Sequence, residues 1–109
     1  MIKLNSIEEF DQALEKEQAL FVLKHSITCP ISQAAYDEYE SFTKEQQGFP
    51  TYYLTVQESR PLSNYIADKF EIRHESPQAI LFTENEAVWH TSHRNITTKS
   101  LTDSLQQTK

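Results

Sequence analysis

The sequence contains only one glycine, Gly48, and one cysteine, Cys29, among its 109 residues. A single glycine excludes the glycine-rich loops that usually bind phosphate groups. A single cysteine excludes an intramolecular disulfide and any metal site built on paired cysteines, and the four histidines lack a His-x-x-x-His spacing. Redox chemistry at Cys29 must therefore use a second sulfur from another molecule.

The sequence also lacks a long apolar run and a cluster of basic residues. Its longest uninterrupted apolar stretch, from Ala19 to Leu23, suits a buried strand, and no segment resembles a signal peptide or a membrane span. Sixteen acidic and ten scattered basic residues give a formal net charge of −6. We therefore expect no binding to nucleic acid or to membranes, and a reducing cytoplasm as the location.

Apolar periodicity predicts one domain over residues 1–109. Hydrophobic residues make up 38% and charged residues 24% of the chain, which is typical of a folded domain. Strands are expected at residues 2–4, 19–23, 51–56, 79–82 and 87–91, and helices after Ser6, from Pro30, after Ser59 and from Thr97. The order βαβαβαββα predicts an α/β fold, a mixed central sheet flanked by helices on both faces.

The cysteine lies between an apolar strand and a helix. Four residues at helical spacing form the expected buried face of that helix: Ile31, Ala35, Tyr39 and Phe42. Pro30 is acceptable at its first position, and a thiol at a helix N-terminus is favoured as the nucleophilic thiolate. Lys24 and His25 precede Cys29, but strand alternation points them to opposite faces, so at most one is expected to assist.

Three segments give the chain a specific resemblance to a known family. They are Thr28-Cys29-Pro30-Ile31-Ser32, the segment from Gln57 to Ile66, and His74-Glu75-Ser76-Pro77-Gln78. The first segment after a strand, with Ser76-Pro77 just before an apolar strand, resembles the thioredoxin superfamily. The order and spacing of all three resemble the YtxJ-like monothiol bacilliredoxins over nearly the whole chain. The resemblance implies a thioredoxin-like fold.

The resemblance implies an enzyme, a thiol-disulfide oxidoreductase that removes bacillithiol from S-bacillithiolated proteins. Bacillithiol is a glucosamine-malate-cysteine thiol that replaces glutathione in some bacteria. The Cys29 thiolate would attack the bacillithiol sulfur of a mixed disulfide, so that the client thiol leaves and Cys29 becomes transiently bacillithiolated. The implied partners are bacillithiolated client proteins and a resolving thiol, either bacillithiol or another redox protein. No tightly bound cofactor is expected, and bacillithiol is a co-substrate.

The resemblance also assigns binding or activating roles to residues beside Cys29. Thr28 and Pro30 flank the nucleophile. Ser32 occupies the position of the second cysteine in a Cys-x-x-Cys pair. Its hydroxyl would donate a hydrogen bond to the thiolate, bond locally in the first helical turn, or do both. The segment from Gln57 to Arg60 also follows a strand and is a further candidate for this end of the sheet.

Two more segments are expected near the thiol. A cis peptide bond before Pro77, as the resemblance implies, would turn the backbone of Ser76 toward the thiol, where it could pair with the main chain of a bound thiol. The loop after the last strand resembles the place where glutaredoxins bind a carboxylate of glutathione. There Arg94 or His93, with the N-terminus of the final helix, would hold the malyl carboxylates of bacillithiol.

Other interpretations remain open at this stage. A lone cysteine is often an inert buried thiol, in which case the chain is a catalytically silent thioredoxin-like module for protein binding. An iron–sulfur cluster carrier of the monothiol glutaredoxin type would have Gly-Phe-Ser where this chain has Pro30-Ile31-Ser32. Peroxidase chemistry would use Ser26 in a Thr-x-x-Cys-like motif, but its upstream proline is replaced by Val22. Phosphatase chemistry is disfavoured, because Ala35 occupies the arginine position of a Cys-x₅-Arg loop.

Overall fold

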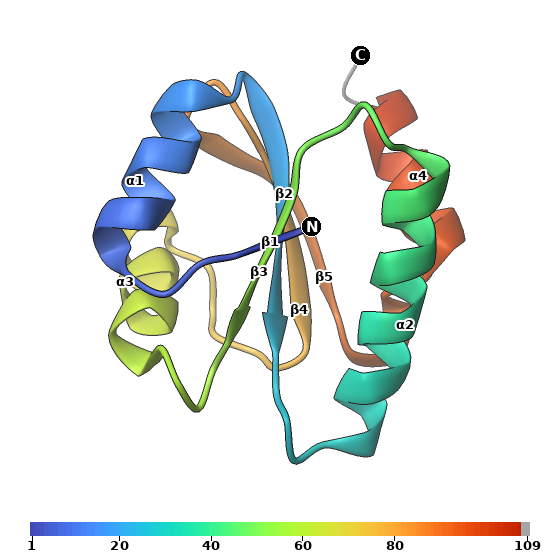
Figure 1. Ribbon diagram of the computed structural model, residues 1–109, viewed down its shortest axis with the longest axis horizontal. Coiled ribbons are helices and arrows are strands. Elements are labelled where there is room, and N and C mark those ends of the chain that lie inside the picture. Colours follow the sequence, from blue (N-terminus) through green and yellow to red (C-terminus); the bar gives the residue numbers. More distant parts are fainter. Residues whose placement is uncertain (108–109) are drawn as a thin grey trace.

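The computed structural model describes residues 1–107, and within them a five-stranded sheet is covered by helices (Figure 1). The strands are β1 (Ile2–Lys3), β2 (Ala19–His25), β3 (Thr51–Thr55), β4 (Gln78–Thr83) and β5 (Glu86–Ser92). The helices are α1 (Ile7–Lys16), α2 (Pro30–Glu45), α3 (Arg60–Phe70) and α4 (Thr98–Gln107), with a short 3-10 helix, η1 (His93–Asn95), before α4. No helix within residues 1–107 has both the length and the apolar character needed to cross a membrane.

The sheet is mixed, with the strand order β1-β3-β2-β4-β5. Strands β1, β3 and β2 run parallel, whereas β4 is antiparallel to both β2 and β5. Helices α1 and α3 cover one face of the sheet, and α2 and α4 cover the other (Figure 1). The predicted α/β class and the order βαβαβαββα are confirmed. The short helix η1 was not predicted.

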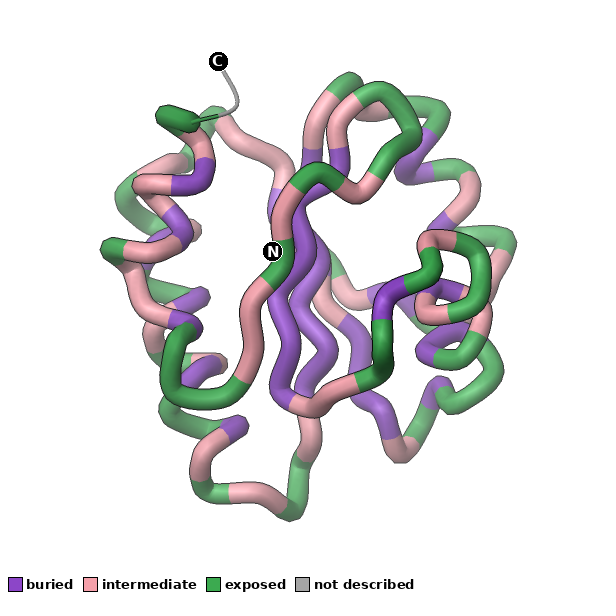
Figure 2. The backbone as a smooth tube through the Cα atoms, turned by 180° about the vertical axis from the view of Figure 1, so that it is seen from behind, coloured by how far each residue is buried: buried purple, intermediate pink, exposed green. Residues whose placement is uncertain are grey.

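The central strand β2 alternates its side chains between two cores. Leu20 and Val22 belong to the core under α1 and α3, whereas Phe21 and Leu23 belong to the core under α2 and α4. Buried residues are concentrated in the central strands and along the inward sides of the helices (Figure 2). Each buried Leu or Phe side chain contributes about 1.5–3 kcal/mol to the stability of the fold. The end of β2, from which the next loop starts, is therefore held in place by both cores.

Two details differ from the sequence prediction. Strand β2 continues for two residues beyond its apolar run, because Lys24 and His25 are both buried and pair with β3. On α2, three of the four residues predicted for the apolar face are buried. At its first position Ser32 is buried, whereas Ile31 is only partly buried. In both cases the buried polar groups have hydrogen-bond partners: Lys24 bonds to Ser63 of α3, and the Ser32 hydroxyl bonds to residues at the end of β2.

The chain forms tight turns without glycine. Glu84 and Asn85 connect β4 to β5 with φ angles of 50° and 66°, and Glu71 ends α3 with a φ of 54°. These angles lie in the left-handed region, which costs a non-glycine residue about 1–2 kcal/mol. Asparagine tolerates this region better than most residues, whereas at Glu84 and Glu71 the conformation is held by the elements that the turns connect.

One end of the sheet collects the segments that carry the sequence motifs. Strands β2 and β3 end there side by side, since His25 pairs with Thr55. Strand β4 begins there and β5 ends there, since Gln78 lies opposite both Lys24 and Ser92. In Figure 1 this is the lower end, where the chain leaves β2 and enters α2. The segments brought together are residues 26–29, 56–60, 74–77 and 93–95.

Candidate functional site at the start of helix α2

Cys29 is the N-cap residue of helix α2, directly before its first residue, Pro30. It has extended backbone angles (φ −110°, ψ 120°), and its carbonyl oxygen accepts hydrogen bonds from the N–H groups of Ser32 and Gln33 at 3.0 and 3.2 Å. Its side chain is half-buried and makes no capping hydrogen bond, and Pro30 occupies the first helical turn. The positive end of the helix dipole therefore lies at the residue that carries the sulfur, and it favours negative charge there.

The loop of residues 26–28, which precedes Cys29, is held from two sides. On one side, the Ser32 hydroxyl oxygen accepts the N–H of Ser26 at 2.8 Å. On the other side, the side-chain amide of Gln57 bonds to Ser26, Ile27 and Thr28. Ile27 and Thr28 themselves are exposed, so the loop lies on the surface but is attached to the sheet end beneath it.

Ser32 is fully buried, and its hydroxyl bonds to two residues that precede Cys29. Besides the Ser26 N–H, its hydroxyl lies 3.0 Å from Nδ1 of His25. The His25 ring packs against Tyr36, with 4.9 Å between ring centroids. Burial lowers the pKa of His25, although the backbone of Ser32 and the charge of Asp37 act in the opposite direction. These two bonds of the Ser32 hydroxyl connect α2 to the end of β2 and the residue after it, and lie outside the first helical turn.

Lys24 lies on the opposite face of β2 from His25, as strand alternation predicts. Its ammonium group is buried, donates to the carbonyl oxygen of Ser63 at 3.0 Å and lies 3.3 Å from Nδ1 of His74. Burial lowers the pKa of Lys24 to about 8. Burial also lowers the pKa of His74, and the neighbouring Lys24 charge lowers it further. The polar partners of Lys24 thus come from α3 and from the segment before β4.

The peptide bond between Ser76 and Pro77 is cis, as the resemblance implied. The carbonyl oxygen of Pro77 accepts the N–H of His93 at 3.0 Å, so this segment is directly attached to η1. Next to it, the pKa of Glu75 is lowered, first by a hydrogen bond from Ser92 and then by the charge of His93. The hydroxyl oxygen of Ser76 is buried and has no hydrogen-bond partner among the residues described.

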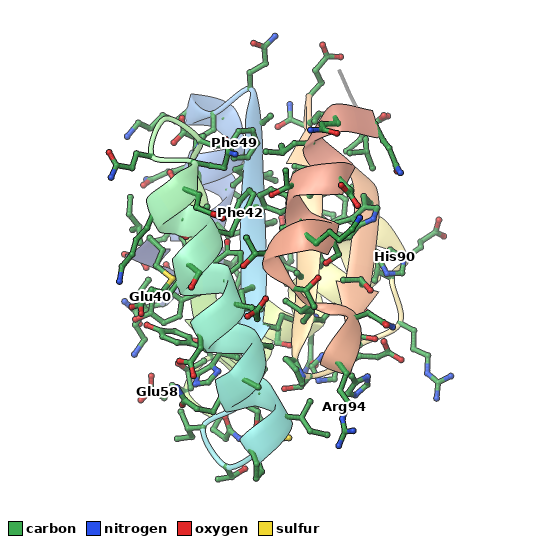
Figure 3. The ribbon with its side chains drawn as sticks, turned by 90° about the vertical axis from the view of Figure 1, so that its right-hand side faces the viewer. Glu40, Phe42, Phe49, Glu58, His90 and Arg94 are labelled. Carbon is green, nitrogen blue, oxygen red and sulfur yellow. The ribbon has the colours of Figure 1, made fainter. Side chains whose placement is uncertain are left out.

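An open groove of about 430 Å³ adjoins the start of α2. It is lined by apolar side chains from Ile31, Ala34, Ala35 and Ile96, and by polar side chains from Glu38, His93 and Arg94. Pro30, the neighbour of Cys29, also lines it. Figure 3 shows Arg94 at the lower end of the molecule, near the first turns of α2. The two binding candidates predicted from the sequence, Arg94 and His93, therefore line one groove that reaches Pro30, the residue after Cys29.

The N-terminus of α4 is already bonded by protein groups. The Glu38 carboxylate accepts the N–H of Thr98 at 2.8 Å, and the Thr97 hydroxyl accepts the N–H of Ser100 at 3.0 Å. These two N–H groups therefore have partners within the protein, and the predicted binding of a ligand carboxylate at this helix end stays a prediction. A carboxylate that belongs to the protein occupies the place, because Glu38 reaches across from α2.

Sequence reasoning missed Glu38 and the detailed role of Gln57. Ile31, Ala34 and Glu38 are spaced as i, i+3 and i+7 on α2, which is the signal that places them on one face beside the groove. Gln57 could be assigned to this end of the sheet from its position after β3, but its bonding partners are about 30 residues away in sequence.

Among residues 1–107, no group of three or more His, Cys, Asp or Glu side chains is arranged to hold a metal ion.

Comparison with known proteins shows the family. A model described as "Monothiol bacilliredoxin BrxC" matches residues 2–101. One solved structure, described as a proposed oxidoreductase with a thioredoxin fold, is 48% identical with a TM-score of 0.91, and the match covers 95% of this chain and 92% of that one. Two thioredoxins share the fold at low sequence identity. The Fasciola hepatica thioredoxin is 14% identical with a TM-score of 0.81, and the match covers 100% of both chains. The Chlamydomonas reinhardtii thioredoxin f2 is 14% identical with a TM-score of 0.80, and the match covers 100% of this chain and 96% of that one. The chain therefore has the thioredoxin-like fold predicted for it and belongs to the monothiol bacilliredoxin family.

Proposed function

We propose that this protein removes bacillithiol from S-bacillithiolated proteins by a monothiol mechanism. The Cys29 thiolate attacks the bacillithiol sulfur of a protein–bacillithiol disulfide. A new S–S bond forms between Cys29 and bacillithiol while the old one breaks, and the client cysteine leaves as a thiolate with the electron pair of the broken bond. No net oxidation or reduction occurs in this exchange. The family and the fold support thiol-disulfide exchange as the reaction class.

The observation that carries this proposal is the position of the only cysteine. Cys29 begins a helix at the end of β2, half-buried, with no side-chain capping bond that would occupy its sulfur. The position three residues later holds the buried hydroxyl of Ser32, which cannot displace a thiol bound to Cys29. The bacillithiolated enzyme must then be resolved by an external thiol, which we propose to be bacillithiol or a second redox protein.

The groove beside Cys29 supports bacillithiol as the co-substrate. Its apolar lining and its volume of about 430 Å³ suit a small molecule, and Arg94 and His93 offer positive or hydrogen-bonding groups for the malyl carboxylates. The negative charge of Glu38 in the same groove repels an anionic ligand, so the attraction of Arg94 for the carboxylates must be stronger than this repulsion. We propose that the clients are cytoplasmic proteins, because the exchange needs reduced thiols to proceed.

The proposal is tested by intact-mass spectrometry. The reduced protein is mixed with a reporter protein that carries bacillithiol on its single cysteine, and Cys29→Ser is run in parallel. We expect one bacillithiol on Cys29, release of the free reporter, and no reaction in the variant. If the wild-type protein accepts no bacillithiol while its folded state is intact, the proposal fails and a silent binding module becomes the better explanation.

A further inference from the structure

Gln57 lies beyond the end of β3, next to the loop that carries the thiol. Strands β2 and β3 remain paired up to their last residues, since His25 lies opposite Thr55 and the carbonyl oxygen of His25 accepts the N–H of Val56 at 2.8 Å. Gln57 follows directly after this bond and is partly buried. Its backbone position is therefore fixed by the sheet, while its side chain reaches the loop of residues 26–28.

The side-chain amide of Gln57 makes three hydrogen bonds to three consecutive residues. Its Nε2 donates to the hydroxyl of Ser26 at 2.8 Å and to the hydroxyl of Thr28 at 3.2 Å. Its Oε1 accepts the backbone N–H of Ile27 at 3.2 Å. Because the amide presents donors and an acceptor on one planar group, it satisfies both kinds of partner at once. No other residue described in the structure bonds to all three.

These bonds act on the part of the loop that the sheet does not hold. Ile27 and Thr28 are exposed and lie beyond the ladder of β2, and Thr28 is covalently joined to Cys29. Ser32 fixes the Ser26 N–H from within the protein, but it bonds to neither Ile27 nor Thr28. The backbone of Cys29 is held by the first turn of α2, and Gln57 on the outer side of the loop fixes the path of Ile27 and Thr28 that leads to it.

We propose that Gln57 is a positioning residue for Cys29. It holds the loop so that the sulfur stays at the N-terminus of α2, where the helix dipole favours the thiolate, and beside the groove that borders Pro30. The inference rests on the proposed function, since it assumes that Cys29 is the reacting thiol. A displacement of about 1 Å at a reacting group can lower a rate about 100-fold, so a surface amide can matter for the rate while contributing little to global stability.

The test compares Gln57→Leu with Gln12→Leu, a matched change at an exposed glutamine of α1. We measure the second-order rate constants for bacillithiol transfer from the reporter and for alkylation by iodoacetamide, across pH 6 to 10. We expect Gln57→Leu to lower the transfer rate about tenfold at pH 7, at temperatures where thermal melting shows the protein to be folded. Gln12→Leu is expected to match the wild-type rates.

A second variant, Gln57→Glu, separates geometry from charge. Its carboxylate can accept the Ile27 N–H and the hydroxyl protons of Ser26 and Thr28, so the loop stays in place, but its negative charge opposes the thiolate. We expect its rate–pH profile to move to higher pH and to reach the wild-type rate there. Gln57→Leu should stay below the wild-type rate even at high pH, because its defect is in geometry.

The outcomes separate this inference from the proposed function. If the wild-type protein accepts no bacillithiol, the proposed function fails, and the iodoacetamide rates still test Gln57. If the wild-type protein reacts and Gln57→Leu reacts equally fast in both assays, the positioning role is overturned. If Gln57→Leu is slower only in proportion to its loss of folded protein, Gln57 is a structural residue, and the inference is overturned as well.

Discussion

The hydroxyl oxygen of Ser32 lies 3.0 Å from Nδ1 of His25 and 2.8 Å from the backbone nitrogen of Ser26. Burial lowers the pKa of His25 and so favours the neutral ring, whose Nδ1 can accept the hydroxyl proton while the oxygen accepts the Ser26 N–H. The side chain in place of a second active-site cysteine thus connects α2 to the end of β2. Neither of these two bonds involves the sulfur of Cys29.

Replacing Ser32 with alanine is predicted to lower stability more than reactivity. The change leaves the partly buried Ser26 N–H and the buried His25 ring without their partner, which costs about 1–3 kcal/mol. Urea denaturation measures the free energy of unfolding, and Ser41→Ala, at an exposed position of α2, is the control. An unchanged free energy of unfolding together with a large loss of Cys29 alkylation would instead show that Ser32 acts directly on the thiolate.

Because of Lys24, the free energy of unfolding is expected to change with pH in the alkaline range. Burial lowers its pKa from 10.5 to about 8 in the folded state, whereas an unfolded lysine titrates near 10.4. Below pH 8 both states are protonated, and the cost of burying the charge is present in full. Between pH 8 and about 10.4 the unfolded state binds more protons, so this cost disappears and stability rises with pH.

We therefore predict that Lys24→Met is more stable than the wild-type protein at pH 7. The advantage should shrink by up to about 3 kcal/mol as the pH rises from 8 to 10.4, since only the wild-type protein gains stability there. Urea denaturation at four pH values measures the difference, with Lys44→Met at an exposed position as the control. A difference that does not change with pH would contradict the prediction.

Glu71 offers a site for stabilisation far from the thiol. It ends α3 in the left-handed conformation, and the next N–H, from Ile72, bonds to the carbonyl oxygen of Ala67 at 3.0 Å, as in helix ends that usually carry glycine. We predict that Glu71→Gly raises the free energy of unfolding by about 0.5–1 kcal/mol, because relief of backbone strain exceeds the entropy cost of glycine. The control Glu40→Gly, within α2, should lower it by about 1 kcal/mol.

The order of elements was predictable from the sequence because apolar periodicity and turn residues report local structure. The motif around Cys29 could be placed for the same reason, since a strand followed by Cys-Pro and a helix defines its location. The burial of Ser32 in place of Ile31 could not be predicted. It depends on His25 and Ser26, which meet Ser32 only when α2 folds back onto β2.

Other parts of the candidate site could not be predicted from the sequence for a different reason. The three bonds of Gln57 join residues about 30 positions apart, and no periodicity reports such pairs. The short helix η1 begins at His93 with a φ of 56°, an angle that nothing in its sequence favours. Its N–H bond to Pro77 belongs to the folded structure and fixes the loop beside the groove.

Arg94 is predicted to contribute to the recognition of bacillithiol and not to the reactivity of the thiol. Arg94→Ala should lower kcat/KM for the bacillithiolated reporter about 5- to 10-fold, because a charge-assisted bond to a carboxylate contributes about 1–1.5 kcal/mol at an exposed site. Alkylation of Cys29 by iodoacetamide should not change. Arg73→Ala, at another exposed arginine before β4, is the control. Equal kcat/KM values for Arg94→Ala and the wild-type protein would exclude Arg94 from the site.

Glu38 provides the opposite test of the same groove. Its carboxylate accepts the Thr98 N–H, and glutamine can keep that bond through its own oxygen while the negative charge is lost. If the groove binds the malyl carboxylates, Glu38→Gln should raise kcat/KM for the bacillithiolated reporter about 2- to 5-fold at low salt, and the gain should fall as salt screens the charge. The variant should lose about 0.3–1 kcal/mol of stability, because an anion at the start of α4 is favoured by the helix dipole.

Glu40→Gln is the control, since Glu40 lies on the opposite side of α2 from Arg94 (Figure 3). A slower reaction of Glu38→Gln would show that the carboxylate assists binding, and the assignment of the groove to the malyl group would have to be abandoned.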